Sequence, residues 1–262
     1  MLIDTHNHLD FPGFDDDREA LLHQCASLGV RRQMLIGVEE SLWSQLWSTA
    51  LAHEPLYAAL ALHPCYLDVH KESDIDTLRA WLDQWAGHPK LCALGEFGLD
   101  YYIEQPDKAR QQTLFESHLE LAIEYELPSL LHVRKAHADV IATLKRYKPP
   151  RAGVVHAFAG SYEEAREYLK LGFKLGLGGA PTWPQANRLR KVVPRLPLDG
   201  IVLETDAPDM APAMYPGIRN SPTHLPAICA ALAELFGVTS EALAQASTTN
   251  ACAVFGWDPD AL

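Results

Sequence analysis

The sequence has few cysteines, and they do not occur in the pairs that disulfide frameworks or thiolate metal sites use. The five cysteines are odd in number, widely spaced and without a CxxC pair: Cys25, Cys65, Cys92, Cys229 and Cys252. Disulfide scaffolds use even numbers of cysteines, and thiolate zinc sites use closely spaced pairs. We therefore expect reduced cysteines, with neither a disulfide framework nor a thiolate zinc site.

Long hydrophobic runs are also missing. No apolar stretch approaches the roughly 18 residues that a membrane-spanning helix requires. The N-terminus lacks a basic segment followed by an apolar core and a cleavage site, which is the pattern of a secretory leader. These features predict a cytoplasmic protein with no membrane association, and no segment indicates an obligate protein partner.

Positive charge is scarce. Lysine and arginine number 22 against 34 aspartates and glutamates, which gives a net charge of −12. A protein that holds a long nucleic-acid duplex by its surface needs clustered lysines and arginines to neutralise the phosphates, so the composition counts against that class. A small phosphate ester or a strand end stays compatible, because bound metal ions supply positive charge locally.

The chain does contain a regular alternation of short apolar runs and amphipathic helical stretches. The apolar runs, interpreted as strands, cover 2–9, 31–38, 56–63, 90–96, 128–133, 152–158, 173–179 and 199–206. The helical stretches that follow them cover 17–29, 40–53, 74–88, 108–127, 137–147, 161–172, 185–196 and 223–237, and a final one covers 239–256.

Strands that alternate with helices form parallel sheets, and eight such units close a barrel. We predict an α/β fold in which residues 1–262 form one domain, a single (β/α)8 TIM barrel with an extra C-terminal helical segment. A doubly wound open sheet is the alternative, but no Gly-rich phosphate loop follows the first predicted strand.

The first predicted strand carries two histidines one residue apart, in MLIDTHNHLD. Because side chains alternate along a strand, we expect Asp4, His6 and His8 on one face and Asn7 on the other. A His-x-His pair is weak evidence for a metal by itself. Further ligands must come from the rest of the chain.

Ligand-type side chains recur at the C-terminal ends of the predicted strands, where a barrel of this kind carries its active site. They are His6, His8, His63, Glu96, His132, His156, Glu204 and Asp206. Each alone has an ordinary interpretation as a hydrogen-bonded core, rim or turn residue. Gathered at one barrel mouth and unpaired, they would be costly to bury, and a metal centre explains them together.

Six of these side chains exceed what one tetrahedral zinc needs, whereas two ions about 3.5 to 4 Å apart that share a carboxylate use all six. We predict Glu96, on a middle strand, as the shared ligand. One ion is expected at His6, His8, Glu96 and Asp206, and the other at Glu96, His132 and His156. The predicted cofactors are two divalent ions (Mg, Mn or Zn), and the four imidazoles favour transition metals over magnesium.

Six motifs in order, DTHNHL, GEFGLDY, PSLLHVR, HAFAG, LETDAP and RNSP, resemble those of the TatD-like metal-dependent hydrolases. The resemblance covers nearly the whole chain. It implies an amidohydrolase-type barrel with a binuclear centre that cleaves phosphodiesters, as a magnesium-dependent deoxyribonuclease acting at a 3′ end. The implied partner is therefore a DNA 3′ end or a small phosphodiester. The family's ligands fall on His6, His8, Glu96, His132, His156 and Asp206.

The sequence departs from the family pattern after the third predicted strand. The family often has a second histidine two residues after the first, whereas HPC places Cys65 there. His63 is then a candidate for substrate binding or for supporting a ligand.

Further roles follow from the chemistry of the residues. Two close divalent ions generate hydroxide from water near neutral pH, and Asp206 is the predicted base, with Glu96 as the other catalytic residue. Asp4 and Glu204 precede ligands by two residues and are expected to orient them, although a purely structural hydrogen bond is equally expected for Asp4.

Arginine and aromatic side chains near strand ends are candidates for substrate contacts. Arg134 and Arg219 are predicted to bind phosphate, because guanidinium pairs with it bidentately, and a surface role is the alternative. Tyr101, Tyr102 and Trp183 are placed to stack on a base or to pack the loops together.

Two other functions remain open. The same barrel type also supports hydrolysis of a small cyclic amide, lactone or ester. Those relatives often bridge their metals with a carboxylated lysine, so Glu96 favours the phosphodiester branch. A metal-dependent binding or scaffold protein would be expected to have lost a ligand, and none of the six is missing.

Overall fold

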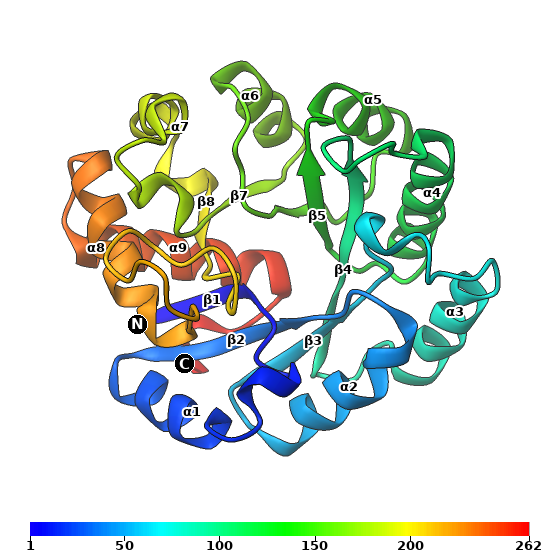
Figure 1. Cartoon of the computed structure of the whole chain (residues 1–262), viewed down its shortest axis with the longest axis horizontal. Coiled ribbons are helices and arrows are strands. Elements are labelled where there is room, and N and C mark those ends of the chain that lie inside the picture. The colour runs from blue at the N-terminus through cyan, green and yellow to red at the C-terminus, as the bar shows by residue number, and fades with distance from the viewer. Residues whose placement is uncertain (262) are drawn as a thin grey trace.

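Strands and helices alternate along the computed structural model, which describes residues 1–261 (Figure 1). Eight strands form one sheet, in which each strand pairs in parallel with the next along the chain. The strands are β1 (Leu2–Asn7), β2 (Val30–Ile36), β3 (Leu56–Leu60), β4 (Leu91–Asp100), β5 (Ser129–Arg134), β6 (Gly153–Val155), β7 (Lys174–Leu177) and β8 (Ile201–Leu203). The predicted (β/α)8 TIM barrel is confirmed.

Each strand is followed by an α-helix at the place the sequence predicts. The α-helices are α1 (Arg18–Ser27), α2 (Trp43–Ala52), α3 (Asp74–Trp85), α4 (Lys108–Glu124), α5 (His137–Tyr147), α6 (Tyr162–Lys170), α7 (Asn187–Val192), α8 (Leu225–Phe236) and α9 (Ser240–Phe255). Short 3-10 helices are η1 (Pro12–Phe14), η2 (Glu40–Leu42), η3 (Pro64–Tyr66), η4 (Ala180–Thr182), η5 (Val193–Arg195), η6 (Leu198–Gly200), η7 (Pro222–His224) and η8 (Pro259–Ala261).

The apolar core lies in two places, inside the barrel and between the barrel and its helices. Inside, Ile3 and Met34 of the first two strands pack with residues of later strands and with Phe255 of α9. The Asn250 side chain of α9 also donates to the carbonyl of Ile201 at 2.7 Å, at the start of β8. The extra C-terminal helix therefore closes the N-terminal end of the barrel, and Figure 1 shows it beside β1.

The barrel is joined between its first strand and the segment after its last strand. Asp4 Oδ1 accepts the N–H of Thr205 at 2.9 Å, and Oδ2 accepts the hydroxyl of the same residue at 2.6 Å. Further along, the N–H of Asp206 donates to the carbonyl of His6 at 2.9 Å. We call these bonds between residues 4–8 and 203–207 the barrel seam. They bring a residue near the start of the chain beside one near its end.

Six strands end two or three residues earlier than predicted, and β4 and β5 end later. β6 ends at Val155 and β8 at Leu203, so His156 and Asp206 lie on the loops that follow. β4 continues to Asp100, so the prediction that Glu96 ends this strand is wrong. Glu96 is instead an extra residue in the pairing of β4 with β5, between Gly95 and Phe97. Such a bulge re-aims a side chain within a strand.

The simple alternation predicted for β1 does not hold either. Asn7 was expected on the face opposite Asp4, yet its side-chain amide donates to Asp4 Oδ2 at 3.1 Å. The pairing of β1 with β2 shifts between these two residues, which turns the strand. Asp4 bonds the backbone N–H of His6 at 3.3 Å and the Thr205 groups of the seam. Of the two roles expected for Asp4, orienting a ligand and making a structural hydrogen bond, these contacts support the structural one.

No single helix in the described part of the chain is long and apolar enough to span a membrane. The segments Pro222–Phe236 and Ser240–Phe255 pass a length and composition test only as a pair, with a bend of 107° between them. The cytoplasmic location stays a prediction.

Replacing Asp4 with alanine should destabilise the barrel at its seam. The substitution leaves the buried N–H and hydroxyl groups of Thr205 without acceptors, and each such group costs about 1 to 3 kcal/mol. We expect the free energy of unfolding, measured by urea titration, to fall by roughly 2 to 5 kcal/mol. Asp16→Ala, at an exposed position, should change it by less than about 0.5 kcal/mol. Equal stability of the two variants would contradict this account of the seam.

Candidate metal centre

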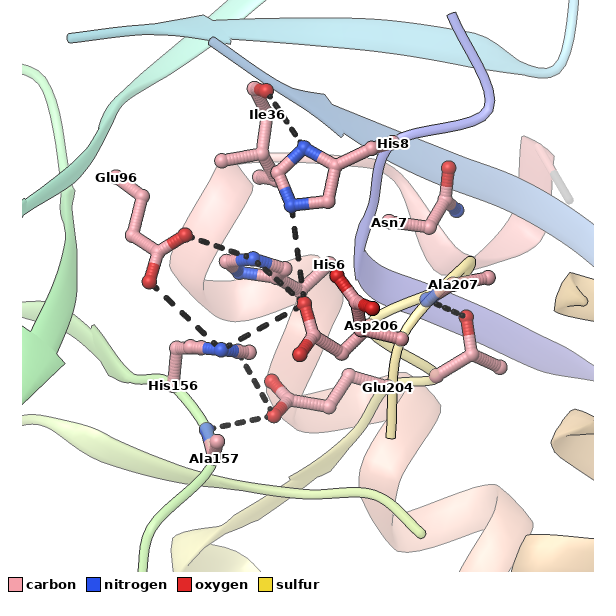
Figure 2. A network of polar contacts seen from close by, with 12 residues as sticks. His6, Asn7, His8, Ile36, Glu96, His156, Ala157, Glu204, Asp206 and Ala207 are labelled. Carbon is pink, nitrogen blue, oxygen red and sulfur yellow. Dashed lines mark hydrogen bonds and ion pairs between the residues drawn. The ribbon is translucent and has the colours of Figure 1, made fainter. Parts of the chain in front are cut away.

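Four imidazoles and two carboxylates meet at the C-terminal end of the barrel, and Glu96 lies among them. Figure 2 shows three of these imidazoles, those of His6, His8 and His156, with both carboxylates. Both of its oxygens face imidazoles. Oε2 is 3.2 Å from His6 Nε2, whereas Oε1 is 2.7 Å from His132 Nδ1 and 3.8 Å from His156 Nε2. The side chain of Glu96 is only 5% exposed, so these contacts take the place of water around its charge.

Asp206 faces two of the same imidazoles, His6 and His156, and also that of His8, from the other side of the barrel. Its Oδ1 is 3.5 Å from His6 Nε2, 3.7 Å from His8 Nε2 and 3.8 Å from His156 Nε2. The residue has a φ of +59°, in the left-handed region, on the turn that follows β8. The barrel seam holds this turn against β1, so all six predicted ligands gather in one cluster.

The predicted division of the six ligands between two ions differs somewhat from the groups that the structure forms. Donor atoms of His6, His8 and Glu96 lie within 4.8 Å of one another, as do those of His6, His156 and Asp206. His156 was expected only with Glu96 on the second ion, but its ring also stacks on that of His6 with centroids 3.5 Å apart. The cluster is therefore more compact than two separate ligand sets.

Three of the imidazoles have an Nε2 atom directed at the carboxylates. His8 Nδ1 is 3.1 Å from the Ile36 carbonyl, which only accepts, so Nδ1 is the donor and Nε2 keeps a lone pair. His156 Nδ1 lies 3.0 Å from Glu204 Oε1, which orients its ring in the same way. His6 Nε2 is buried and makes no hydrogen bond. Imidazole nitrogens beside carboxylate oxygens fit a divalent metal ion.

Burial lowers the pKa of His8 to about 3, which keeps this ring neutral and able to coordinate. Burial alone would raise the pKa of Glu96, but the imidazoles of His63, His156 and His6 outweigh it and hold that pKa well below the usual range. Glu96 is therefore a carboxylate near neutral pH, as a metal ligand must be.

The ring of His132 is held by a residue that the sequence analysis did not single out. Asp100 Oδ2 lies 2.8 Å from His132 Nε2, and Oδ1 accepts the N–H of Tyr102 at 2.7 Å. This arrangement leaves His132 Nδ1 to face Glu96. Asp100 stands four residues after Glu96 in the quoted motif GEFGLDY, and residues four apart in a strand share a face. That spacing was the sequence signal that could have identified Asp100 as a residue near the metal centre.

Two glycines make room for this second layer of carboxylates and rings. A Cβ at Gly176 of β7 would lie 2.2 Å from Glu204 Oε2, so only glycine leaves space for the carboxylate behind His156. Gly98 has a φ of +148°, and a Cβ there would lie 2.1 Å from the carbonyl oxygen of His132. Both positions require glycine where β-strands approach the centre closely.

The centre opens into a cavity of about 470 Å³ whose lining includes the predicted substrate residues His63 and Arg134. His63 Nε2 is 3.2 Å from Glu96 Oε1, so it touches the same carboxylate oxygen as His132. Arg134 is exposed, and its guanidinium lies 3.8 Å from the centre of the Tyr102 ring. Tyr102 is 59% exposed.

The remaining predicted substrate contacts lie outside the cavity lining. The guanidinium of Arg219 bonds the carbonyl of Gly13 and the carboxylate of Asp17. Tyr101 donates its hydroxyl to Asp139 at 2.9 Å, and the Trp183 indole donates to the carbonyl of residue 211 at 3.0 Å. The structure therefore brings His63 and Arg134 to the centre but not Arg219.

Comparison with known proteins gives the same class. The family model described as TatD related DNase matches residues 3–256. The chain is 40% identical over 253 residues to YjjV of Escherichia coli K12, named an uncharacterized metal-dependent hydrolase, with 97% of each chain covered. It is 33% identical over 256 residues to YabD of Bacillus subtilis 168, named likewise, with 97% and 99% covered.

Solved structures agree with these relatives. The crystal structure of YjjV superposes with a TM-score of 0.93 at 39% identity and covers 98% of both chains. A TatD family hydrolase from Entamoeba histolytica has the same fold, with a TM-score of 0.86, 19% identity and 97% of both chains covered.

The fold and the cluster of histidines and carboxylates define a metal-dependent hydrolase. Within that class, the chain belongs to the TatD family.

Protein stripped of metal should become less stable as pH rises above about 6.5. Burial lowers the pKa of both His132 and His156, but the facing carboxylates outweigh it and raise the two values to about 8 and about 10. Folding therefore favours the protonated rings. That stabilisation is complete below the ordinary histidine pKa of about 6.5 and is lost as pH rises through the raised pKa values. For each histidine, the free energy of unfolding falls by at most about 1.4 kcal/mol for each unit of pH.

Urea unfolding of the stripped protein between pH 6.5 and 9 measures this loss. His132→Gln should flatten the lower part of the curve, because only His156 then contributes. Stability that rises over this interval in the unaltered protein would contradict the assignment.

Proposed function

We propose that this hydrolase cleaves phosphodiester bonds at the 3′ end of DNA, using two divalent metal ions that share Glu96. The observation that carries the proposal is the position of this carboxylate, whose Oε2 faces His6 and whose Oε1 faces His132. A carboxylate with a separate imidazole at each oxygen has the donor arrangement of a bridging ligand. The description of the matching family model as a DNase supports the choice of bond.

The six side chains His6, His8, Glu96, His132, His156 and Asp206 are the proposed metal ligands. When bound, a pair of divalent ions lowers the pKa of water and offsets the negative charge of a phosphodiester. Zinc suits the imidazoles, and magnesium and manganese suit the carboxylates. The chain itself supplies the orientation, because Asp100 and Glu204 hold the far nitrogens of His132 and His156.

Asp206 is the proposed acceptor of the proton that water releases. Its side chain is 15% exposed and lines the cavity. Burial raises the pKa of Asp206 to about 6, although His156 and His6 act in the opposite direction. It therefore stays a carboxylate near neutral pH but binds a proton more readily than an ordinary aspartate.

The cavity and the charge of the chain favour a strand end over a long duplex. Among the residues that line the cavity, Arg134 is the only arginine or lysine. One guanidinium and two metal ions match a single phosphodiester, whereas a duplex needs many basic contacts and the chain carries a charge of −12. Arg134 is the proposed phosphate contact, with His63 beside it, and Arg219 stays a prediction.

The proposal is tested with metal-stripped protein and single-stranded DNA labelled at its 5′ end. Adding back Mg²⁺, Mn²⁺ or Zn²⁺ should produce stepwise shortening. Glu96→Ala should lower the rate by at least about a hundredfold, because it removes the shared ligand. Glu163→Ala, an exposed glutamate on α6, is the matched control and should keep the full rate.

The same metal series is applied to an aryl ester and a lactone. Intact DNA under every metal, with hydrolysis of either small substrate, would reject the nuclease proposal in favour of an amidohydrolase-type activity. Shortening that survives Glu96→Ala would reject the shared-ligand role.

Arg134→Ala should weaken substrate binding more than it slows turnover. A guanidinium–phosphate contact contributes about 1.5 to 3 kcal/mol, which corresponds to a rise in KM of about 10-fold to 150-fold. Steady-state kinetics on a short oligonucleotide separate KM from kcat. Arg166→Ala, an exposed arginine on α6, is the control. Unchanged KM in Arg134→Ala would remove this residue from the binding site.

A further inference from the structure

We propose that His63, Cys65 and His132 form a separate binding site for a thiophilic divalent ion such as Zn²⁺ or Cd²⁺, and that an ion bound there inhibits the hydrolase. We call these three residues, with Asp100, the rim site. The inhibitory part rests on the proposed function of the main centre, whereas the binding part does not.

The geometry of the rim site is that of a ligand cluster. Donor atoms of His63, Cys65 and His132 lie within 4.8 Å of one another. Cys65 Sγ is 3.3 Å from Asp100 Oδ2, which is itself 2.8 Å from His132 Nε2. The rings of His63 and His132 have centroids 4.4 Å apart. Two imidazole nitrogens and one sulfur are three of the four donors that a tetrahedral zinc site uses, and Asp100 lies beside two of them.

The sulfur distinguishes this site from the main centre. The six proposed ligands of the main centre offer nitrogen and oxygen only, which also suit Mn²⁺ and Mg²⁺. Thiolate selects Zn²⁺ and similar soft ions over those hard ions. The two sites should therefore sort metals by chemistry, with hard ions confined to the main centre and soft ions able to bind at both.

The rim site is open to incoming ions. Cys65 is exposed, whereas Cys25, Cys92, Cys229 and Cys252 are buried. His63 and His132 line the cavity that leads to the main centre. The expectation that no thiolate zinc site exists rested on the spacing of the cysteines in the sequence. That spacing does not reveal that the fold brings His132 on β5 beside Cys65 on η3.

Inhibition follows from the two nitrogens of His132. Nδ1 faces Glu96, and Nε2 faces Asp100 and the rim site. A neutral imidazole has one lone pair, so the ring binds an ion through one nitrogen while the other carries a proton. In the loaded main centre, Nδ1 would hold the ion and Nε2 would carry the proton that faces Asp100. An ion at the rim site would take Nε2, the displaced Nε2 proton would pass through solvent to Nδ1 as Nδ1 leaves the main centre, and the Cys65 thiol proton would go to solvent. Nδ1 would then donate to Glu96 and bind no ion of the main centre.

The binding part is tested by titrating metal-stripped protein with Cd²⁺ and recording the ultraviolet charge-transfer band of a cadmium thiolate. The unaltered protein should develop the band, and Cys65→Ser should not. His63→Ala should keep the thiol but weaken the affinity by roughly tenfold or more, because a ligand is lost. Cys92→Ser, which replaces a buried cysteine on β4, is the matched control and should keep the band.

Absence of the band in the unaltered protein, or its persistence in Cys65→Ser, would overturn the rim site. A band whose affinity is unchanged by His63→Ala would reduce it to a single exposed thiol, which also overturns the proposal. These outcomes are independent of any hydrolysis.

The inhibitory part is tested with Mn²⁺-loaded enzyme on the oligonucleotide assay. Added Cd²⁺ should inhibit the unaltered enzyme, and Cys65→Ser should raise the inhibitory concentration by about tenfold. Equal inhibition of both enzymes, with the band present, would reject the inhibitory role alone. If the enzyme has no nuclease activity, the same comparison is made on whichever ester it hydrolyses, so the two proposals fail separately.

Discussion

The barrel seam is the constraint on which the rest of the structure depends. Asp4 bonds both the N–H and the hydroxyl of Thr205, and the next residue along, Asp206, donates its N–H to His6. The seam thus holds residues from opposite ends of the chain in contact. Because the metal centre draws ligands from both sides of it, the centre forms only when the barrel closes, and the fold and the chemistry are coupled at this point.

The centre concentrates polar groups that a protein interior disfavours. Glu96 and His6 are nearly fully buried, and burying charged groups is costly unless they are paired. Here the pairing is mutual, since imidazoles hold the pKa of Glu96 low while carboxylates raise the pKa of His156 to about 10. A metal ion that replaces the protons of these imidazoles pairs with the same carboxylates. The cluster is therefore arranged for a cation, with protons as the substitute when none is bound.

The sequence predicts the repeating architecture well, because each strand and helix has a local signal in its pattern of apolar residues. It also predicts six ligands that the structure gathers in one cluster. It wrongly places Glu96 at the end of its strand and Asn7 on the face opposite Asp4. Both positions depend on register shifts between neighbouring strands that no local pattern reveals. Asp100 and Cys65 acquire their contacts from His132 on another strand, so their importance emerges only in three dimensions.

The most direct test of the account is to count and locate the ions. Crystals of metal-stripped protein soaked in Mn²⁺, a hard ion that should avoid the rim site, are measured at the manganese absorption edge. The account predicts two anomalous peaks about 3.5 to 4 Å apart, one on each oxygen of Glu96. A single peak, or two peaks that do not share Glu96, would contradict it.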